Sequence, residues 1–509
     1  MNTLVLLLIS IAVLFCGYVF YGGWVARQWG VNEGNHPTPA HTMEDGVDYV
    51  PAKAPILMGH HFSSIAGAGP ITGPIGAAMF GWLPVTLWVL IGGIFFGGVH
   101  DFGALFASIR HQGKSIGEII SLNMSKRAKQ LFIIFSYLTL ILVVAAFAAI
   151  VASTFGATYK DGVLDMAASA TKASVAMVSI MFILIAIVFG FAVSRRHTPM
   201  VISSILGVGA IVLCMAVGMN FHPFYFSMNT WMILVGIYIT IASVTPVWIL
   251  LQPRDYLSSF LLYAMLIVAG IGIVGAHPTI DEKVFPAFAG FTINNANGTQ
   301  FLFPILFTTV ACGAISGFHS LVSSGTTSKQ LDKESDAKPI AYGGMLLECV
   351  LAIITLCAIG YARVTGHTHG ATDIFAGGIA AMVAAIPGFE GLKNIMYTLL
   401  VLTYSAFCLT SLDTATRLAR FMFQEFWLEP GENPKDVKDG FRKLMVNPYF
   451  ATIITVILGI SLGMGGFAKI WGLFGAANQL LAAIGLLAVA AWLGLSLIQI
   501  CEPTRIRRI

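Results

Sequence analysis

Charge is scarce in this 509-residue sequence. Only 10% of the residues are Asp, Glu, Lys or Arg, 57% are hydrophobic, and the mean hydropathy is +0.83. A soluble globular domain has about 25% charged residues, so this composition excludes that class and is typical of a polytopic helical protein in a lipid bilayer. The formal net charge of +4 is small, and we expect no nucleic-acid partner.

Signatures of metal sites and metalloenzymes are also lacking. The seven cysteines are scattered along the chain, at Cys16, Cys214, Cys312, Cys349, Cys357, Cys408 and Cys501. They form no CxxC or Cys/His ligand spacing, so we interpret them as packing residues rather than as disulfides or metal ligands. No HExxH motif occurs. We therefore expect no enzyme, no catalytic residue, no metal and no cofactor.

Long apolar runs are abundant. Thirteen windows have the length of a membrane-spanning helix, at about 4–22, 57–80, 83–108, 130–154, 174–194, 200–219, 229–250, 257–277, 300–324, 341–362, 393–412, 450–465 and 477–499. The first window has no basic region before it, so we interpret it as an uncleaved span rather than a signal peptide. The sequence predicts an all-α polytopic membrane protein with about thirteen transmembrane helices.

The basic residues predict the orientation of these spans. Lys and Arg cluster in the connections 109–129, 325–340 and 413–447 and in the tail, at Arg505, Arg507 and Arg508. Basic connections alternate with connections poor in Lys and Arg, as the positive-inside rule requires. This alternation predicts an N-terminus outside and a C-terminus in the cytoplasm.

The spans group into six parts. They are an extra N-terminal helix (1–22), a cytoplasmic loop (23–56), a first five-helix repeat (57–219), a second five-helix repeat with extracellular loops (220–412), a cytoplasmic loop (413–447), and two C-terminal helices with a basic tail (448–509). The repeats are expected to be inverted relative to each other, each with one broken helix.

One apolar stretch is rich in residues that interrupt helices. Four glycines and two prolines lie between Gly67 and Gly76, and irregular backbone at membrane depth is tolerated only inside protein or along a wet cavity. Pro74 is expected to begin a new half-helix, whose free N–H groups would favour a carboxylate. The expected substrate-binding residues are Ala68, Gly69, Pro70, Thr72, Gly73 and Gly76. The alternative is a packing kink with small residues.

A second interruption is predicted in the segment 241–256, where Pro246 follows Thr245 and a Gln-Pro-Arg-Asp step follows at 252–255. Breaks in corresponding members of two repeats indicate an inverted-repeat transporter with a site at the midplane. We expect Thr245 and Trp248 to form the wall opposite the first break.

Polar side chains within apolar spans are costly and are usually functional. For ion or proton coupling we expect His60, His61, Ser63, Ser64, Ser323, Ser324 and Glu348, because His changes charge near physiological pH and hydroxyl oxygens can hold a cation. Ser323 and Ser324 belong to a run of hydroxyl groups that can instead bond to their own helix. Gate or structural roles are expected for His100, Asp101, Arg254, Asp255, His319 and Asp413.

The residues 59–74 and 98–115 resemble the corresponding stretches of the carbon starvation protein A (CstA) family. Further similar stretches lie at 45–49, 252–257, 317–320 and 412–417, and the likeness extends over nearly the whole chain. The chain resembles the shorter members of that family. The resemblance implies a bacterial inner-membrane protein of the amino acid-polyamine-organocation superfamily with a leucine-transporter-like fold.

Members of that family are described as pyruvate/proton symporters or as peptide uptake systems, both linked to nutrient limitation. The related fold holds a cation between the first broken helix and hydroxyls seven helices later, which the resemblance places at Ser63 to Ala68 and at Ser323 and Ser324. Some proton-coupled relatives have a Lys near that site, whereas the window 200–219 has none. The coupling ion therefore stays open between H⁺ and Na⁺.

We expect a secondary active transporter that imports a small carboxylate, first of all pyruvate by proton symport, through alternating access. Peptide uptake by the same fold is the alternative, since Glu348 can pair with an amino group. A channel and a membrane-embedded enzyme are less favoured hypotheses. The sequence leaves the oligomeric state open.

Overall fold

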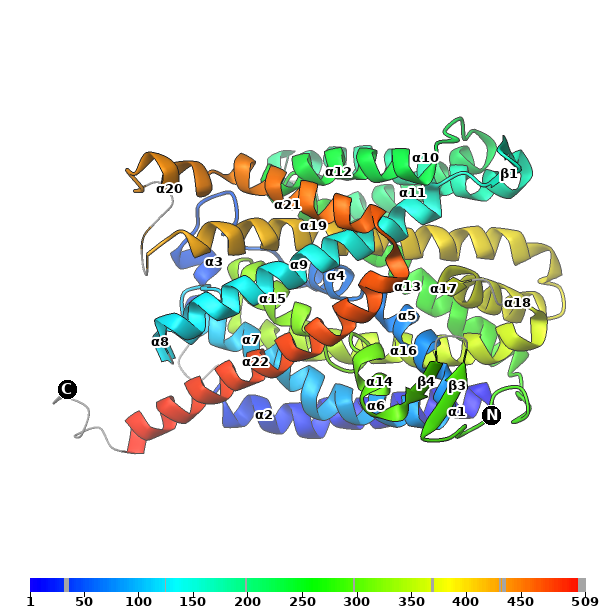
Figure 1. Ribbon diagram of the computed structural model, residues 1–509, viewed down its shortest axis with the longest axis horizontal. Coiled ribbons are helices and arrows are strands. Elements are labelled where there is room, and N and C mark those ends of the chain that lie inside the picture. Colours follow the sequence, from blue (N-terminus) through cyan, green and yellow to red (C-terminus); the bar gives the residue numbers. More distant parts are fainter. Residues whose placement is uncertain are drawn as a thin grey trace.

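The computed structural model describes residues 1–31, 36–123, 125–196, 199–295, 298–367, 370–429, 432 and 436–501, so the basic tail lies outside the described residues. The described part is almost entirely helical (Figure 1). Two short antiparallel hairpins are present in it, β1 (Tyr159–Lys160) with β2 (Val163–Leu164) and β3 (Thr292–Asn295) with β4 (Gly298–Phe301). The predicted all-α class is confirmed.

The α-helices follow in chain order: α1 (Thr3–Cys16), α2 (Gly22–Gln28), α3 (Pro39–Thr42), α4 (Ala54–Ile65), α5 (Gly69–Ala77), α6 (Trp82–Gly92), α7 (Gly98–Arg110), α8 (Ile116–Asn123), α9 (Lys126–Phe155), α10 (Met166–Arg196), α11 (Met200–Asn220), α12 (Met228–Val244), α13 (Leu251–Ala276), α14 (Leu302–Thr309), α15 (Gly317–Gly325), α16 (Gly343–Thr365), α17 (Gly370–Thr372), α18 (Gly378–Ala384), α19 (Lys393–Phe426), α20 (Gly440–Met445), α21 (Pro448–Met464) and α22 (Phe467–Cys501). Short π-helical turns join α1 to α2, α6 to α7 and α17 to α18, and another precedes α16.

Nine helical segments of the described chain are long and apolar enough to cross a membrane. Three shorter apolar helices cover Met228–Val244, Gly370–Ala384 and Pro448–Met464. Two further predicted windows, 57–80 and 300–324, coincide with interrupted helices. The chain is therefore a multi-pass membrane protein, but helix length and composition do not confirm the predicted count of thirteen spans.

Most helices run between two ends of the molecule (Figure 1). At one end, called the α8 end, lie α3, α8 and α20. At the other, called the α18 end, lie α18, β1 and the N-terminus. The predicted basic connections 109–129 and 413–447 contain α8 and α20, so both lie at the same end. Which end faces the cytoplasm stays a prediction.

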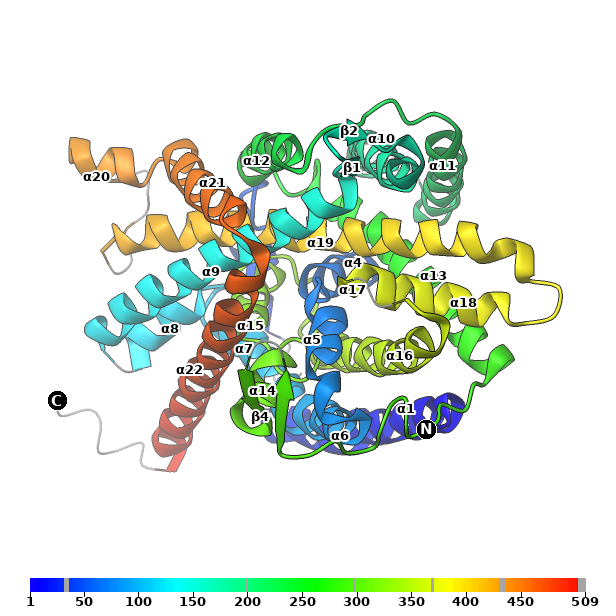
Figure 2. The same ribbon diagram turned by 45° about the vertical axis from the view of Figure 1, so that its right-hand side comes forward.

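The first interruption lies at the predicted position. The helix α4 ends at Ile65 and α5 begins at Gly69, with Pro70 in its first turn and Pro74 inside it. The half-helix therefore begins earlier than Pro74, which was the predicted start. In Figure 2 this pair of half-helices lies in the middle of the molecule, with α16 and α19 to either side.

The interruption predicted within 241–256 is present. The helix α12 ends at Val244, because Pro246 disfavours the helical conformation of the residue before it, and 245–250 form the connection to α13. The segment that contacts the first break is another one, α14–α15, which is non-helical at 310–316. We call 310–316 the second break. The predicted repeat boundaries are not tested by this difference and stay a prediction.

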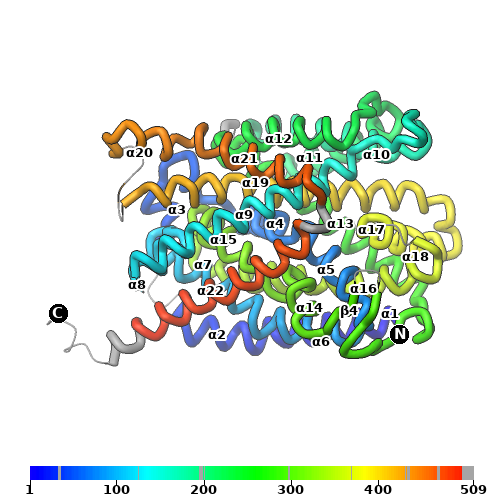
Figure 3. Tube along the Cα trace, in the orientation of Figure 1, coloured from blue at the N-terminus to red at the C-terminus, as the bar shows by residue number. Residues whose placement is uncertain are grey.

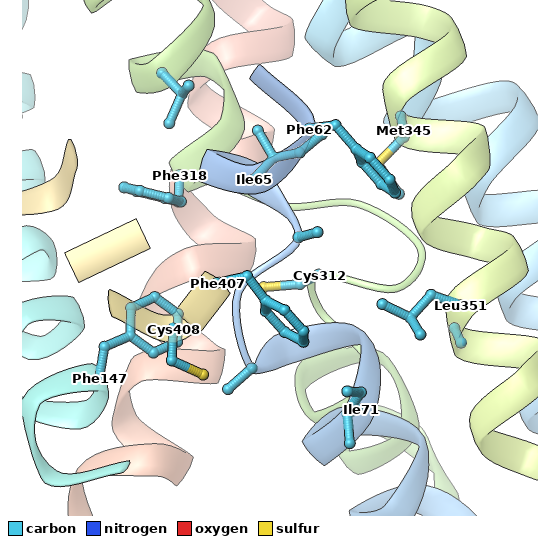
Figure 4. Close-up of a cluster of buried hydrophobic side chains, with 14 of the residues drawn as sticks. Phe62, Ile65, Ile71, Phe147, Cys312, Phe318, Met345, Leu351, Phe407 and Cys408 are labelled. Atoms are coloured by element: carbon cyan, nitrogen blue, oxygen red, sulfur yellow. The ribbon is translucent and has the colours of Figure 1, made fainter. Parts of the chain in front are cut away.

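The two breaks are in direct contact. A Cβ placed on Gly69 would lie 2.2 Å from Cβ of Cys312, and one placed on Gly73 would lie 2.7 Å from the carbonyl oxygen of Thr309. Only a residue without a side chain permits this approach. Figure 4 shows the surrounding apolar side chains, among them Ile71 and Phe407. The irregular backbone is thus buried in protein, as it must be at membrane depth.

Replacing Gly69 with Ala tests this contact. The added methyl group must displace Cys312, and we expect a loss of stability of about 1–3 kcal/mol, the usual cost of overpacking. Thermal unfolding of the purified protein in detergent measures it. Gly270→Ala, on α13 where no atom lies within 4 Å of the added group, is the matched control and should not be destabilised. Adding Cys312→Gly to Gly69→Ala should restore part of the loss; no recovery would contradict the contact.

Candidate functional site

A buried charged cluster lies beside α4, and we call it the Arg254 cluster. It consists of His60, Tyr238, Arg254, Asp255 and Asp413. Nδ1 of His60 lies 2.6 Å from Oδ2 of Asp255, whose Oδ1 accepts from Nη2 of Arg254 at 2.7 Å. Arg254 also donates to Asp413, and the Tyr238 hydroxyl donates to the same carboxylate at 2.7 Å. The cluster joins α4, α12, α13 and α19.

The charge balance of the Arg254 cluster depends on His60. Two carboxylates face one guanidinium, so the cluster carries a net negative charge when His60 is neutral and no net charge when it is protonated. His60, Asp255 and Asp413 have side chains that are 0% exposed. An unbalanced charge is expensive at such a site.

A second buried cluster lies on the other side of α4, and we call it the His319 cluster. Asp101 accepts hydrogen bonds from Nδ1 of His100 and Nδ1 of His319, both at 2.8 Å. On its other side, Nε2 of His319 lies 3.4 Å from Oε2 of Glu348. The three helices α7, α15 and α16 contribute these residues, which are all fully buried.

Hydroxyl groups of α19 contact the first break. The Ser411 hydroxyl donates to the carbonyl oxygen of Ser64 at 2.8 Å, and the hydroxyls of Ser64 and Thr414 lie 3.1 Å apart. The Ser63 hydroxyl donates to the carbonyl of Asp255 at 3.2 Å. The end of α4 therefore offers oxygen atoms from both backbone and side chains, the donor type that hard cations prefer.

Two neighbouring amides of α22 hold the second break. Oδ1 of Asn478 accepts from the N–H of Phe318 at 2.8 Å, and its Nδ2 donates to the Ser316 hydroxyl at 3.0 Å. Nε2 of Gln479 donates to the carbonyl of Phe307 at 2.7 Å. These bonds satisfy backbone groups that the interruption leaves without helical partners.

The predicted substrate-binding residues divide into two groups. Those from Ala68 to Gly76 lie at the first break and in α5, where the Ala68 carbonyl already accepts from the N–H groups of Ile71 and Thr72. The Thr72 hydroxyl lies 3.3 Å from that of Tyr404. Thr245 and Trp248, in contrast, lie in the α12–α13 connection.

The predicted coupling residues also separate. His60, Ser63 and Ser64 are together near the end of α4, and Glu348 belongs to the His319 cluster. Nδ1 of His61 lies 2.9 Å from Oγ1 of Thr327. Ser324 accepts from the N–H of Ile116 and donates to the carbonyl of Ser320, so it joins α15 to α8; Ser323 is buried beside it.

A loop closes the α8 end of the Arg254 cluster. Asp48 pairs with Arg417 at 3.0 Å, and Arg417 also donates to the carbonyls of Ala242 and Thr245 at the end of α12. Burial alone would raise the pKa of Asp48, but the charges of Arg417 and of two other basic residues, Lys329 and Arg420, outweigh it and hold that pKa below its ordinary value. The carboxylate therefore stays charged and keeps the loop on α19.

Cavities lie toward both ends of the molecule. One of about 490 Å³ at the α8 end is lined by Tyr49, Lys329 and Glu425, among others. One of about 390 Å³ at the α18 end is lined by Thr154, Lys172 and Asp373, among others. Thr154, at the wall of the second cavity, bonds Ser405 at 2.9 Å. The first break lies between the two cavities along α19.

A family model described as carbon starvation protein CstA matches residues 2–367 and 359–497 of the chain. The chain belongs to the CstA family. The peptide transporter CstA of Bacillus subtilis (strain 168) is 33% identical over 537 residues, covering 96% of this chain and 84% of that protein. The peptide transporter CstA of Helicobacter pylori (strain J99 / ATCC 700824) is 35% identical, covering 96% and 77%.

A relative named for a different substrate is also similar to this CstA-family chain. The pyruvate/proton symporter BtsT of Escherichia coli (strain K12) is 29% identical over 557 residues, covering 94% of this chain and 75% of that protein. Among solved structures, a Na⁺-coupled sialic acid symporter in a substrate-bound outward-open state matches with 12% identity and a TM-score of 0.45, covering 94% of this chain and 86% of that one.

Several residues of the site were missed by the sequence analysis of this CstA-family chain. They are Tyr238, Cys312, Ser411, Thr414, Asn478 and Gln479. Asn478 and Gln479 are the two adjacent amides within the apolar window 477–499, and Ser411 and Thr414 flank Asp413. The cost of polar groups in lipid was a signal that could have found them.

Arg254→Gln tests the Arg254 cluster. The substitution leaves two buried carboxylates without their cation, and we expect a loss of about 3–5 kcal/mol of stability, as for other broken buried pairs. Thermal unfolding in detergent at neutral pH measures the change. Arg27→Gln, on the exposed side of α2, should have little effect. Equal melting temperatures for the two variants would show that the buried pairs do not stabilise the fold.

Proposed function

We propose that the protein is a secondary active transporter that imports a small carboxylate nutrient by alternating access, most of all pyruvate by proton symport. The observation that carries this proposal is the contact of two interrupted helices between a cavity at each end. Broken helices that meet inside a membrane protein are typical of transporter substrate sites. The CstA relatives, named as peptide transporters or as a pyruvate/proton symporter, support the same class.

The substrate carboxylate is proposed to bind at the start of α5. The N–H of Gly69 and the positive end of the α5 dipole face the break, and Pro70 has no N–H of its own to place there. Cys312 occupies the space against Gly69, so substrate entry requires the two breaks to separate. A single anion-binding helix end suits a monocarboxylate such as pyruvate.

A peptide is the second candidate substrate. Its amino group needs an acidic partner, and the cavity at the α18 end has both Lys172 and Asp373 in its lining. A substrate with two opposite charges is complementary to that lining. Seven similar CstA relatives are named peptide transporters, which adds support to this candidate.

The coupling proton is proposed to bind the Arg254 cluster at His60. Protonation removes the net charge of the cluster, and the cluster joins α4 to α12, α13 and α19. Loss of the proton weakens the tie between α4 and α13, which frees the half-helix to move. The alternative ion is Na⁺, held by oxygens of Ser64, Ser411 and Thr414.

Uptake of labelled pyruvate into proteoliposomes tests this function. We expect accumulation above equilibrium under an inward proton gradient, no accumulation under an inward sodium gradient, and no competition from unlabelled dialanine. Accumulation under sodium alone would move the ion site to Ser64 and Ser411. Failure under both gradients, with labelled dialanine accumulated instead, would replace pyruvate by peptides.

His60→Gln tests the coupling site separately. The variant keeps a polar side chain but cannot be protonated, so we expect proton-driven uptake to fall at least about tenfold and to lose its pH dependence. The control is His41→Gln, because His41 also pairs with an aspartate, Asp332 at 2.8 Å, but is exposed at the α8 end. A His60→Gln protein with wild-type pH dependence would remove His60 from the coupling step.

A further inference from the structure

Three potential metal ligands converge beside the second break. They are Cys312 in the non-helical stretch, His319 on α15 and Glu348 on α16. One donor atom from each lies within 4.8 Å of the other two. The exposed fractions of Cys312, His319 and Glu348 are 4%, 0% and 0%. Figure 4 shows Cys312 on its coil beside the first break.

Asp101 orients the imidazole of His319 as metal sites require. Its Oδ2 lies 2.8 Å from Nδ1, and a carboxylate at this distance assigns the proton to Nδ1. In the neutral ring Nε2 then carries a lone pair and points at Glu348. In zinc sites, the ring nitrogen of a histidine that does not bind the metal usually donates its proton to a carboxylate, a backbone carbonyl or water.

The arrangement needs a positive species between His319 and Glu348. The lone pair on Nε2 and the Glu348 carboxylate are both acceptors, and they are 3.4 Å apart. Nε2 and both Glu348 oxygens have no hydrogen-bond partner among the described residues. Two facing acceptors in an apolar interior repel each other unless a proton or a metal ion lies between them.

The third donor indicates which cation. A thiolate is a soft ligand that favours Zn²⁺ or Cd²⁺ over Na⁺, Mg²⁺ or Ca²⁺. One thiolate and one carboxylate have together two negative charges, which a divalent ion neutralises inside the low-dielectric core. The third acid, Asp101, is not a ligand and is held by hydrogen bonds from His100 and His319. We propose that Cys312, His319 and Glu348 form a binding site for a soft divalent metal ion of the zinc type.

The ion would connect three segments. With bonds of about 2.0–2.3 Å, the donor atoms of a tetrahedral site stand about 3.3–3.7 Å apart, so the thiol of Cys312 needs only a small shift. Three protein ligands leave one position open. A bound ion would tie the stretch 310–316 to α15 and α16, and would hold the second break in one conformation.

Cd²⁺ titration of the full-length protein in detergent tests the proposal. We expect one equivalent of Cd²⁺ to produce a thiolate-to-metal absorption band in the ultraviolet, with release of the thiol proton. Cys312→Ser should abolish the band. Glu348→Gln and Asp101→Asn should weaken binding by about 10–100-fold. Cys357→Ser is the matched control. Cys357 is buried like Cys312, but it lies on α16 and its thiol donates to the carbonyl of Thr3. This variant should bind Cd²⁺ as the wild type does.

Three results would overturn the proposal: no band in the wild-type protein, a band that persists in Cys312→Ser, or a band that is lost in Cys357→Ser. The wild-type titration needs no variant to fold, so the first result is decisive by itself. A second measurement is the melting temperature, which Cd²⁺ should raise in the wild type and not in Cys312→Ser.

One consequence rests on the proposed transport function. If the second break must open during uptake, Zn²⁺ should inhibit uptake by the wild type and by Cys357→Ser, and should inhibit Cys312→Ser less when each is measured relative to its own uptake without metal. Metal binding without inhibition would contradict the role of the second break in transport and leave the metal site intact. Inhibition without a Cd²⁺ band would contradict the metal site.

Discussion

The close approach of two interrupted helices is the constraint on which the rest of the structure depends. Gly69 and Cys312 leave no space between them, and each interruption leaves some backbone groups without a partner in their own helix. Their polar groups must be satisfied from elsewhere, because no water reaches them in a bilayer core. Ser411 of α19 and Asn478 and Gln479 of α22 supply those bonds. The positions of α19 and α22 therefore depend on the backbone groups that the breaks leave without helical partners.

Buried charged groups also depend on partners from other helices. The Arg254 cluster and the His319 cluster both consist of acids and bases from helices that are distant in sequence, and both are fully buried. Each charged group can be buried in the core only because another helix provides a group of opposite charge. A relative movement of the helices therefore changes the balance of buried charge, and a change of that balance moves the helices. This reciprocity is the physical basis of coupling between an ion and a conformational change.

The sequence predicted the helical class, the first break and the polar residues of the core, because each has a local signal. The glycines and prolines of 67–76 interrupt a helix wherever they occur. The second break was missed because 310–316 contain one glycine and no proline, and amides more than 150 residues away hold its path. The pairing of His60 with Asp255, 195 positions apart, has no local signal either. The sequence shows which polar residues are costly in lipid, but only the fold shows which of them are in contact.

One helix runs past both cavities and the first break. Figures 1 and 3 show α19 extending from one end of the molecule to the other. It has 34 residues, which corresponds to about 51 Å. Along it, Tyr397 lines the cavity at the α18 end, Ser411 contacts the first break and Arg417 holds the loop at the α8 end. A rigid rod pivoting near its middle moves its two tips in opposite directions, so a tilt of α19 that widened one mouth of the protein would narrow the other.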